Sequence, residues 1–325
     1  MRLTVLGAGA IGVHLTARLA RAGLRPRLLA RAAQAAVIRD EGLRFEGAEG
    51  HFQVPVDVSA DPADFGPQDA VIVAVKAHAL PATVDTIQPL LGPSTVVVTA
   101  VNGVPWWYFH GAPGERQAWR LERLDPQARL WREIGPQRVI GCVVQSANEI
   151  VAAGHVRNGS ASNGFVIGEP DGSLSPRVRA LADWLRQGIP ELVTSQDIRR
   201  EIWAKLLLNM SSSPLACLTH SSAADIAAAP ALHPLFRRTL QEGAGVAAAL
   251  GCAVEVDPEA RLARMAGIRH RSSMLQDLEA GRPLEIDAQL RVVQDLARRT
   301  GVDTPTLDTL LALLVQRARG AGLYP

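Results

Sequence analysis

The chain has 325 residues, of which 47% are hydrophobic, and this length and composition predict a globular protein of about two domains. Its net charge is only +2, with acidic and basic residues interspersed and no basic cluster among aromatic residues, which argues against a nucleic-acid partner. It contains no apolar run of the roughly 18 residues that cross a membrane, and no cleavage-type signal precedes the first strand, so we expect a cytoplasmic protein without membrane contact.

The first predicted elements are a strand at residues 2–6 and a helix that continues to Arg21. The six residues between them, GAGAIG, have the GxGxxG spacing of dinucleotide-binding turns, in the strand-to-helix position that the pattern requires. The first glycine permits a tight turn, the second lets the backbone approach a pyrophosphate, and the third allows close packing of helix and strand. A glycine turn without a ligand is the alternative, which this position disfavours. The cofactor-binding residues predicted here are Gly7, Gly9, Ala10, Ile11 and Gly12.

The second predicted strand, at 27–30, ends where a dinucleotide-binding domain meets the ribose of the adenosine. An NAD-specific site usually has an acidic residue there, about 20 residues beyond the glycines, to bind the 2'-hydroxyl. This chain has Arg31, and its first acidic residue is Asp40. A guanidinium can bind a 2'-phosphate through two hydrogen bonds, so the sequence predicts NADP(H) as the cofactor. A solvated arginine is the alternative in a chain this rich in arginine.

Two further strands are predicted at 70–75 and 95–99, with a helical stretch at 79–90 between them. A polar residue follows each strand, Lys76 the first and Asn102, in Val-Asn-Gly, the second. Ligands of open parallel sheets bind outside the carboxyl ends of the strands, which places both residues near the cofactor. Asn102 would equally suit an ordinary turn before glycine.

An aromatic-rich segment follows at 104–136, in a chain with only 4% aromatic residues. We consider two interpretations: a lid or pocket wall beside the nicotinamide, or a long loop that packs its own small core or a subunit contact. The sequence does not decide between them.

Strands at 138–147, 164–167 and 191–194 and a helix at 176–187 complete the first half, and the remainder is helical almost throughout. The predicted fold class is therefore α/β, with an N-terminal Rossmann-type NADP-binding domain followed by an all-helical C-terminal domain. We place the boundary so that residues 1–195 bind the cofactor and residues 196–325 serve substrate binding and dimerisation.

The first helix of the second half, at 197–209, contains the residue to which we assign the chemistry. Lys76 and Lys205 are the only lysines among the 34 basic side chains, and a partly buried lysine, unlike arginine, can release a proton near neutral pH. Lys205 and Asn209 share one face of a helix that is apolar nearly all round, so we expect partial burial to lower the pKa of Lys205. The alternative is a surface pair with Glu201, four residues away.

Two more motifs, SSMLQD at 272–277 and EID at 285–287, flank a short helical piece. Position alone makes Ser273 a helix cap and puts Glu285 in the first turn of the next helix. A final helix that opens at Thr304 carries leucines at core spacing. The three cysteines are odd in number and far apart, which argues against a disulfide framework or a zinc site, and no metal is expected.

Together these motifs resemble the ketopantoate reductase family, the NADPH-dependent 2-dehydropantoate 2-reductases of pantothenate biosynthesis. The resemblance runs from the first strand to the last helix in the family's order. It implies an oxidoreductase that reduces a 2-oxo acid, with Lys205 as the general acid that protonates the developing alkoxide and Glu285 binding the hydroxyl end of the substrate. The motifs that carry it are GAGAIG, Arg31, VKA at Lys76, VNG at Asn102, RxEIWxKLLLN at 199–209, SSMLQD and EID. The further contacts it implies are Asn102, Asn209 and Ser273 to the substrate, and Arg31, Lys76 and Asn102 along the cofactor.

Three departures from the family pattern concern the substrate. Ser213 stands as a substrate contact where the family usually has a second asparagine, Leu284 replaces the usual threonine before EID, and Leu290-Arg291 replaces Asn-Gly. These changes and the aromatic segment do not alter the reaction type that the resemblance implies. They leave open whether the substrate is a different or bulkier oxo or hydroxy acid. A catalytically silent NADP-binding sensor is a further alternative, against which the joint presence of Lys205, Asn209, Ser273 and Glu285 argues. The oligomeric state stays open, with a homodimer as one candidate.

Overall fold

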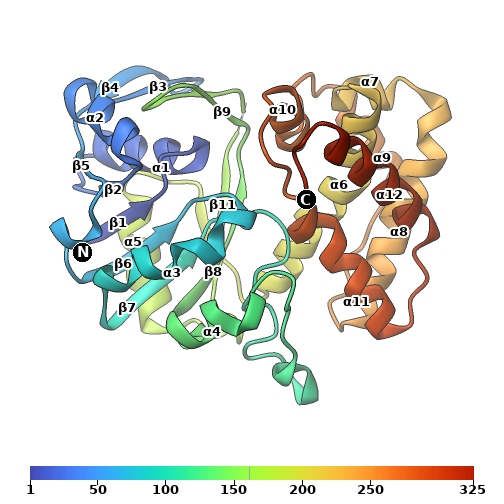
Figure 1. The fold of residues 1–325 in the computed structure, drawn as a ribbon, viewed down its shortest axis with the longest axis horizontal. Helices are drawn as coiled ribbons and strands as arrows, with labels where there is room; N and C mark the ends of the chain where they lie inside the picture. The colour runs from blue at the N-terminus through green and yellow to red at the C-terminus, as the bar shows by residue number, and fades with distance from the viewer. Residues whose placement is uncertain (161) are drawn as a thin grey trace. The chain divides into compact units, whose positions relative to one another are not determined.

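A computed structural model describes residues 1–160 and 162–325, and its residues form two compact units (Figure 1). Unit 1 consists of Met1–Val101 and Pro105–Ile198, and unit 2 consists of Asn102–Val104 and Arg199–Pro325. The short segment Asn102–Val104 therefore packs with the C-terminal unit although unit 1 precedes and follows it in the chain. Unit 1 is an α/β unit and unit 2 is helical, which confirms the predicted fold class.

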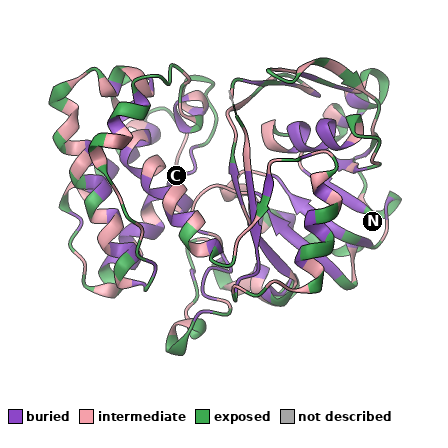
Figure 2. Cartoon of the chain, turned by 180° about the vertical axis from the view of Figure 1, so that it is seen from behind, coloured by how far each residue is buried: buried purple, intermediate pink, exposed green. Residues whose placement is uncertain are grey.

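An eight-stranded sheet forms the centre of unit 1, in the order β12-β11-β8-β7-β6-β1-β2-β5. Neighbouring strands are parallel except at the β8–β11 pair, which is antiparallel. The inner strands are rich in Val, Leu and Ile because both faces of a parallel sheet are covered. Figure 2 shows them as the buried part of the unit. The strands are β1 (Leu3–Leu6), β2 (Arg27–Leu29), β5 (Asp57–Ser59), β6 (Gln68–Val73), β7 (Leu91–Thr99), β8 (Val139–Gln145), β11 (Gly164–Gly168) and β12 (Leu192–Thr194).

Helices connect these strands. The principal ones are α1 (Ala10–Arg21), α2 (Ala32–Glu41) and α5 (Pro176–Arg186), the last capped by the Ser175 side chain, which accepts from the Val178 amide at 3.2 Å. The stretch predicted as a helix at 79–90 is mostly 3-10 in character, with one α-helical turn, α3 (Val84–Ile87). The reason is Pro81 and Pro89, which have no amide hydrogen to donate.

A second, four-stranded sheet in unit 1 has the order β4-β3-β10-β9 and was not predicted. The β3–β4 hairpin has alternating polar and apolar residues around Gly47 and Gly50, a pattern that predicts such a hairpin. Helix α1 contacts strands of both sheets and is therefore buried on several sides. Burial lowers the pKa of its His14 to about 3, so that this imidazole is neutral beside Phe45. The strands are β3 (Leu43–Gly47), β4 (Gly50–Val54), β9 (Asn148–Ala152) and β10 (His155–Asn158).

A buried ion cluster ties α1 to two distant loops of unit 1. The Arg18 guanidinium donates to Glu49 at 3.0 Å and to both carboxylate oxygens of Glu191. Only 4% of the Arg18 side chain is exposed, so its charge depends on these partners. Burial opposes ionisation of Glu191, but the hydrogen bonds and charge of Arg18 outweigh it, and the pKa of Glu191 is lowered.

The aromatic segment packs a small core of its own within unit 1. Trp107 is fully buried, and its indole nitrogen donates to Thr99 Oγ1 at the end of β7 at 2.9 Å. Phe109 packs edge-to-face on Trp119, and the Arg120 guanidinium lies 3.5 Å from the centre of the Trp131 ring. These contacts support the interpretation of a self-packed loop.

The aromatic segment of unit 1 also contains the short helix α4 (Arg129–Glu133), and unit 2 contains the helices from α6 onward. The longest, α6 (Ile198–Thr219), packs closely on α8 (His233–Ala249). The absence of a side chain at Gly243 of α8 permits this, since a Cβ there would lie 2.5 Å from Met210 Sδ of α6. The leucines at core spacing in the last helix are buried, as predicted, and they are Leu307, Leu310, Leu311 and Leu314. In the described part of the chain, every helix is too short or too polar to span a bilayer. The other helices are α7 (Ala223–Ala227), α9 (Pro258–Met265), α10 (Ser273–Glu279), α11 (Val292–Thr300) and α12 (Pro305–Gly320), and a π-helical turn at Asp287–Arg291 precedes α11.

Candidate functional site

The glycine-rich turn of unit 1 lies at the carboxyl ends of three adjacent strands. Gly7 has a φ of +112°, and its amide donates to Leu29 O at the end of β2 at 2.9 Å. An added Cβ at Gly7 would lie 2.8 Å from Ala74 O, just beyond β6. The position therefore requires glycine for both its backbone conformation and its close contact.

The other two glycines of the turn, Gly12 and Gly9, differ in whether the fold leaves room for a side chain. A Cβ at Gly12 would lie 1.8 Å from Gly7 O, so the third glycine is required for α1 to pack on the turn. At Gly9 the nearest atom to a Cβ, Ala74 O, is 3.8 Å away, and the residue is exposed. The fold itself does not need glycine at position 9, and its bare backbone at the start of α1 suits a bound phosphate.

Arg31 immediately precedes α2 and is exposed near this turn. Its Nε donates to Gln34 Oε1, and Gln34 Nε2 donates in turn to Ala8 O, both at 3.4 Å. These bonds link the guanidinium to the glycine-rich turn. Lys76, half-buried, follows β6 and precedes the 3-10 helix that begins at Ala77.

The central polar contact of unit 2 joins α6 to the Asn102–Val104 segment. Lys205 Nζ donates to Asn102 Oδ1 at 2.6 Å. Lys205 is half-buried, as the apolar surroundings in its helix predicted. The structure thus brings together two residues that the sequence singled out for separate reasons.

The backbone after Asn102 is held in place by the π-helical turn. The Val104 amide donates to Ala288 O at 2.8 Å. Gly103 has a φ of +91°, and a Cβ there would lie only 2.1 Å from the same carbonyl oxygen. Glycine at 103 is therefore needed for the segment to approach the π-helical turn and present Asn102 to Lys205.

Asn209 lies one helical turn beyond Lys205 on α6. Its Nδ2 donates to Gln289 Oε1 at 3.2 Å. Gln289 was not predicted: it lies between the charged residues Asp287 and Arg291, four residues after Glu285, and nothing in the local sequence distinguishes it. Glu285 is only 4% exposed and immediately precedes the helical turn that carries Gln289.

The two predicted serines occupy different settings. Ser213 lies one helical turn beyond Asn209 on the same face of α6 as Lys205, and it is 4% exposed. Ser273 is exposed at the beginning of α10. The predicted helix cap was misplaced by one residue: Ser272, not Ser273, caps α10 by accepting from the Leu275 amide at 3.3 Å.

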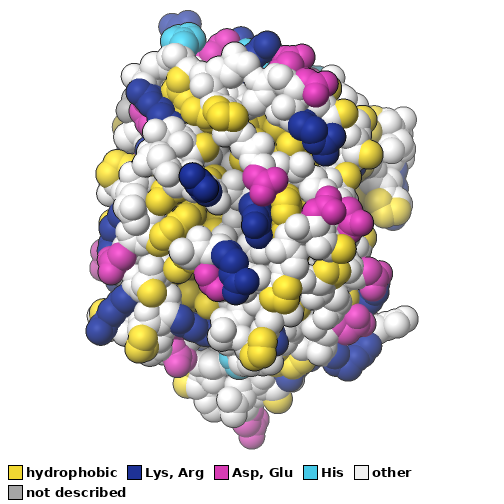
Figure 3. Space-filling model, turned by 90° about the vertical axis from the view of Figure 1, so that its left-hand side faces the viewer, with side chains coloured by type: hydrophobic (Ala, Val, Ile, Leu, Met, Phe, Trp, Pro, Cys, Tyr) yellow, Lys and Arg dark blue, Asp and Glu magenta, His cyan; other side chains and the backbone are white. Residues whose placement is uncertain are grey.

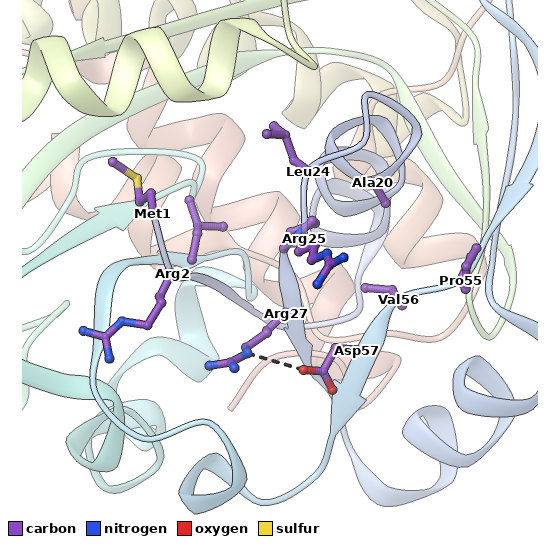
Figure 4. Close-up of a pocket in the computed structure, with 11 residues that line it drawn as sticks. Met1, Arg2, Ala20, Leu24, Arg25, Arg27, Pro55, Val56 and Asp57 are labelled. Atoms are coloured by element: carbon purple, nitrogen blue, oxygen red, sulfur yellow. Dashed lines mark ion pairs between the residues drawn. The ribbon is translucent and has the colours of Figure 1, made fainter.

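A pocket in unit 1 lies at the opposite, amino-terminal edge of β1 and β2 (Figure 4). Its wall includes the Arg27–Asp57 ion pair, with an N–O distance of 3.3 Å. Because ligands of parallel sheets bind at the carboxyl ends of the strands, this pocket is not the cofactor site. The face drawn in Figure 3 shows basic and acidic side chains interspersed, without a large patch of one sign. Residues 1–160 and 162–325 contain no group of three side chains suited to a metal ion.

Comparison with known proteins gives matches along the chain. The family model described as ketopantoate reductase PanE/ApbA matches residues 3–107, and the model of the C-terminal part of that family matches residues 197–318. A 2-dehydropantoate 2-reductase of Mesorhizobium japonicum is 42% identical over 326 residues, covering 100% of both chains. The crystal structure of a candidate ketopantoate reductase from Ralstonia solanacearum MolK2 matches with a TM-score of 0.92 at 40% identity, covering 99% of both chains. That of 2-dehydropantoate 2-reductase from Geobacter metallireducens has a TM-score of 0.84 at 27% identity, covering 97% of this chain and 99% of the other.

Proposed function

The chain belongs to the ketopantoate reductase family, and from this premise we propose that it reduces 2-dehydropantoate (ketopantoate) to pantoate with NADPH, a step of pantothenate biosynthesis. The relatives named above are oxidoreductases of this kind, and family membership makes this chain an oxidoreductase. The observation that carries the proposal is the 2.6 Å hydrogen bond between Lys205 and Asn102.

Lys205 suits the role of general acid. A carbonyl carbon that accepts a hydride leaves negative charge on its oxygen, and a nearby ammonium stabilises that charge and then donates the proton. The alkoxide becomes the 2-hydroxyl, and Lys205 is left neutral until it regains a proton from solvent. Asn102 fixes the direction of the Nζ because its Oδ1 accepts one of the three N–H bonds of the ammonium.

The cofactor fits the residues of unit 1 that line the turn after β1. The exposed backbone of Gly9 would take the pyrophosphate at the start of α1, with Gly7, Ala10, Ile11 and Gly12 forming the rest of the turn. Arg31 would bind the 2'-phosphate that distinguishes NADPH from NADH, and Lys76 would lie along the cofactor. When bound, NADPH supplies the hydride.

The substrate fits the polar residues of unit 2. We assign Glu285 to the substrate hydroxyl, because a carboxylate accepts a hydrogen bond from an alcohol. Asn102, Asn209 and Ser213 would contact the 2-oxo acid from the segment after β7 and from successive turns of α6. Ser273 is the remaining predicted contact, from the start of α10.

The proposal is tested by following the loss of NADPH absorbance with a panel of 2-oxo acids that includes ketopantoate. We expect turnover to be highest with ketopantoate and to require the 2-oxo group. If the protein instead turns over a larger 2-oxo acid and not ketopantoate, the proposed reaction type stands and the proposed substrate is wrong. No turnover of any 2-oxo acid, with either NADPH or NADH, would overturn the proposed function.

A further inference from the structure

Gln289 has a buried hydrogen-bond donor that the protein leaves unused. The residue is 1% exposed, and its Oε1 accepts from Asn209 at 3.2 Å. Among the described residues, its Nε2 has no hydrogen-bond partner. Leaving a buried polar group unpaired destabilises a protein, so such a group calls for an explanation.

The surroundings of Gln289 place this donor beside the proposed chemistry. Its neighbour Ala288 accepts from the Val104 amide at 2.8 Å, and the same segment presents Asn102 to Lys205. On the other side, Asn209 connects Gln289 to α6 one turn from Lys205. The contacts therefore form a closed ring within unit 2, which runs through the α6 face, the Asn102–Val104 segment and the π-helical turn.

The π-helical turn itself determines the position of the side chain. Asp287–Arg291 has i→i+5 geometry, which adds a residue to one helical turn and often occurs at functional sites. The turn is secured by Tyr324, whose hydroxyl donates to Asp287 Oδ1 at 2.7 Å. Gln289 is thus held by the backbone, and its amide group is fixed by Asn209.

We propose that Gln289 is a substrate-binding residue whose Nε2 donates a hydrogen bond to the carboxylate of the 2-oxo acid. The inference rests on the proposed function and adds to it a residue that determines specificity for the acid group. A 2-oxo acid offers two kinds of acceptor, its carbonyl oxygen and its carboxylate. Lys205 takes the carbonyl oxygen as the general acid. The carboxylate is the acceptor that we assign to the amide donor of Gln289, in addition to the contacts proposed above from α6, α10 and the segment after β7.

Two substitutions isolate this donor. Gln289→Glu has nearly the same shape and keeps an oxygen to accept from Asn209, but it replaces the donor with an oxygen that repels a carboxylate. Gln289→Leu removes both polar atoms and tests the position if the charged variant does not fold. Because a hydrogen bond to a charged group contributes about 1.5–3 kcal/mol, we expect KM for the 2-oxo acid to rise about 10- to 100-fold in both variants.

The matched control is Gln294→Leu. Gln294 is also buried, but its Nε2 donates to Asp308 at 2.6 Å, so its amide is already used within the protein. We expect this substitution to lower thermal stability and to leave KM unchanged. The dissociation constant for NADPH, measured by the fluorescence of the bound cofactor, should be unaltered in all three variants.

The outcomes separate the inference from the proposed function. If the wild-type protein reduces a 2-oxo acid and folded Gln289→Leu and Gln289→Glu retain its KM, the inference is wrong and the proposed function stands. If the wild-type protein reduces no 2-oxo acid, the proposed function fails first. A second readout is the 2-oxo amide matching the best acid: it lacks the carboxylate, so its KM should differ little between wild type and Gln289→Glu.

Discussion

Lys205 and Asn102 are joined by a 2.6 Å hydrogen bond although 103 positions separate them in the chain. Asn102 follows the end of β7 by three residues, whereas Lys205 lies in the second turn of α6. The bond is made possible by Gly103, whose lack of a side chain lets the backbone approach Ala288. A backbone contact thereby sets the position of the nitrogen to which we assign the proton transfer.

Substitution of Lys205 tests that assignment. We expect Lys205→Ala to lower kcat by about 10²- to 10⁴-fold, the usual contribution of a general acid, while NADPH still binds. Lys205→Arg is the informative partner variant, because arginine keeps the positive charge but does not give up its proton. Its kcat should also be low. Steady-state turnover and cofactor titration check both variants, and turnover equal to wild type in either one would contradict the role.

Gly9 and Gly12 of the turn should respond differently to alanine. Gly9→Ala should fold normally, because the nearest atom to its new Cβ is 3.8 Å away, yet bind NADPH at least about 10-fold more weakly, since the Cβ would lie where the pyrophosphate binds. Gly12→Ala should destabilise unit 1 severely, because its Cβ would lie 1.8 Å from Gly7 O. Thermal unfolding and cofactor titration separate the two effects.

Gly320→Ala is the control for these variants, because nothing lies within 4 Å of a Cβ at the end of α12. It should match wild type in both measurements. Tight NADPH binding by Gly9→Ala would show that the cofactor does not approach this backbone.

The sequence predicted the glycine turn, Lys205 and Asn102 because each depends on a local pattern. A GxGxxG spacing, a lysine in an apolar helix and a polar residue after a strand can all be identified within a few positions. Gln289 could not be found in this way. Its role depends on Asn209, 80 positions away, and on a π-helical turn that no periodicity in the sequence indicates.

The second sheet was missed for a related reason. Its β3–β4 hairpin is local and has a visible alternation, but β10 pairs in parallel with β3 more than a hundred positions earlier in the chain. Such a pairing leaves no local signal. The stretch predicted as helical at 79–90 is mostly 3-10 rather than α-helical, because Pro81 and Pro89 have no amide hydrogen to donate.

The Arg18–Glu191 pair predicts a specific dependence of stability on pH. Because the pKa of Glu191 in the folded protein lies below its ordinary value of 4.5, the pair stabilises the fold above that pH, and the stabilisation is lost as the pH falls through the folded pKa. Glu191→Gln should therefore lower Tm by a few degrees at neutral pH and flatten its decline below about pH 4.5. Calorimetry over this range is the measurement.

A suitable control for that series is Glu255→Gln, since Glu255 is exposed in unit 2. Its Tm profile should follow wild type. If Glu191→Gln also follows wild type at neutral and acid pH, the Arg18 cluster does not contribute to stability through Glu191.

Arg31 provides the test of cofactor preference. Its guanidinium is exposed and held near the glycine-rich turn through Gln34 and Ala8, where a 2'-phosphate would lie. Arg31→Ala should weaken NADPH binding about 10-fold or more, because it removes a charge-assisted hydrogen bond, and leave NADH binding nearly unchanged. Arg39→Ala, in the same helix, is the matched control for the loss of one positive charge. If Arg31→Ala weakens the binding of NADPH and NADH equally, or if the wild-type protein prefers NADH, Arg31 does not bind the 2'-phosphate.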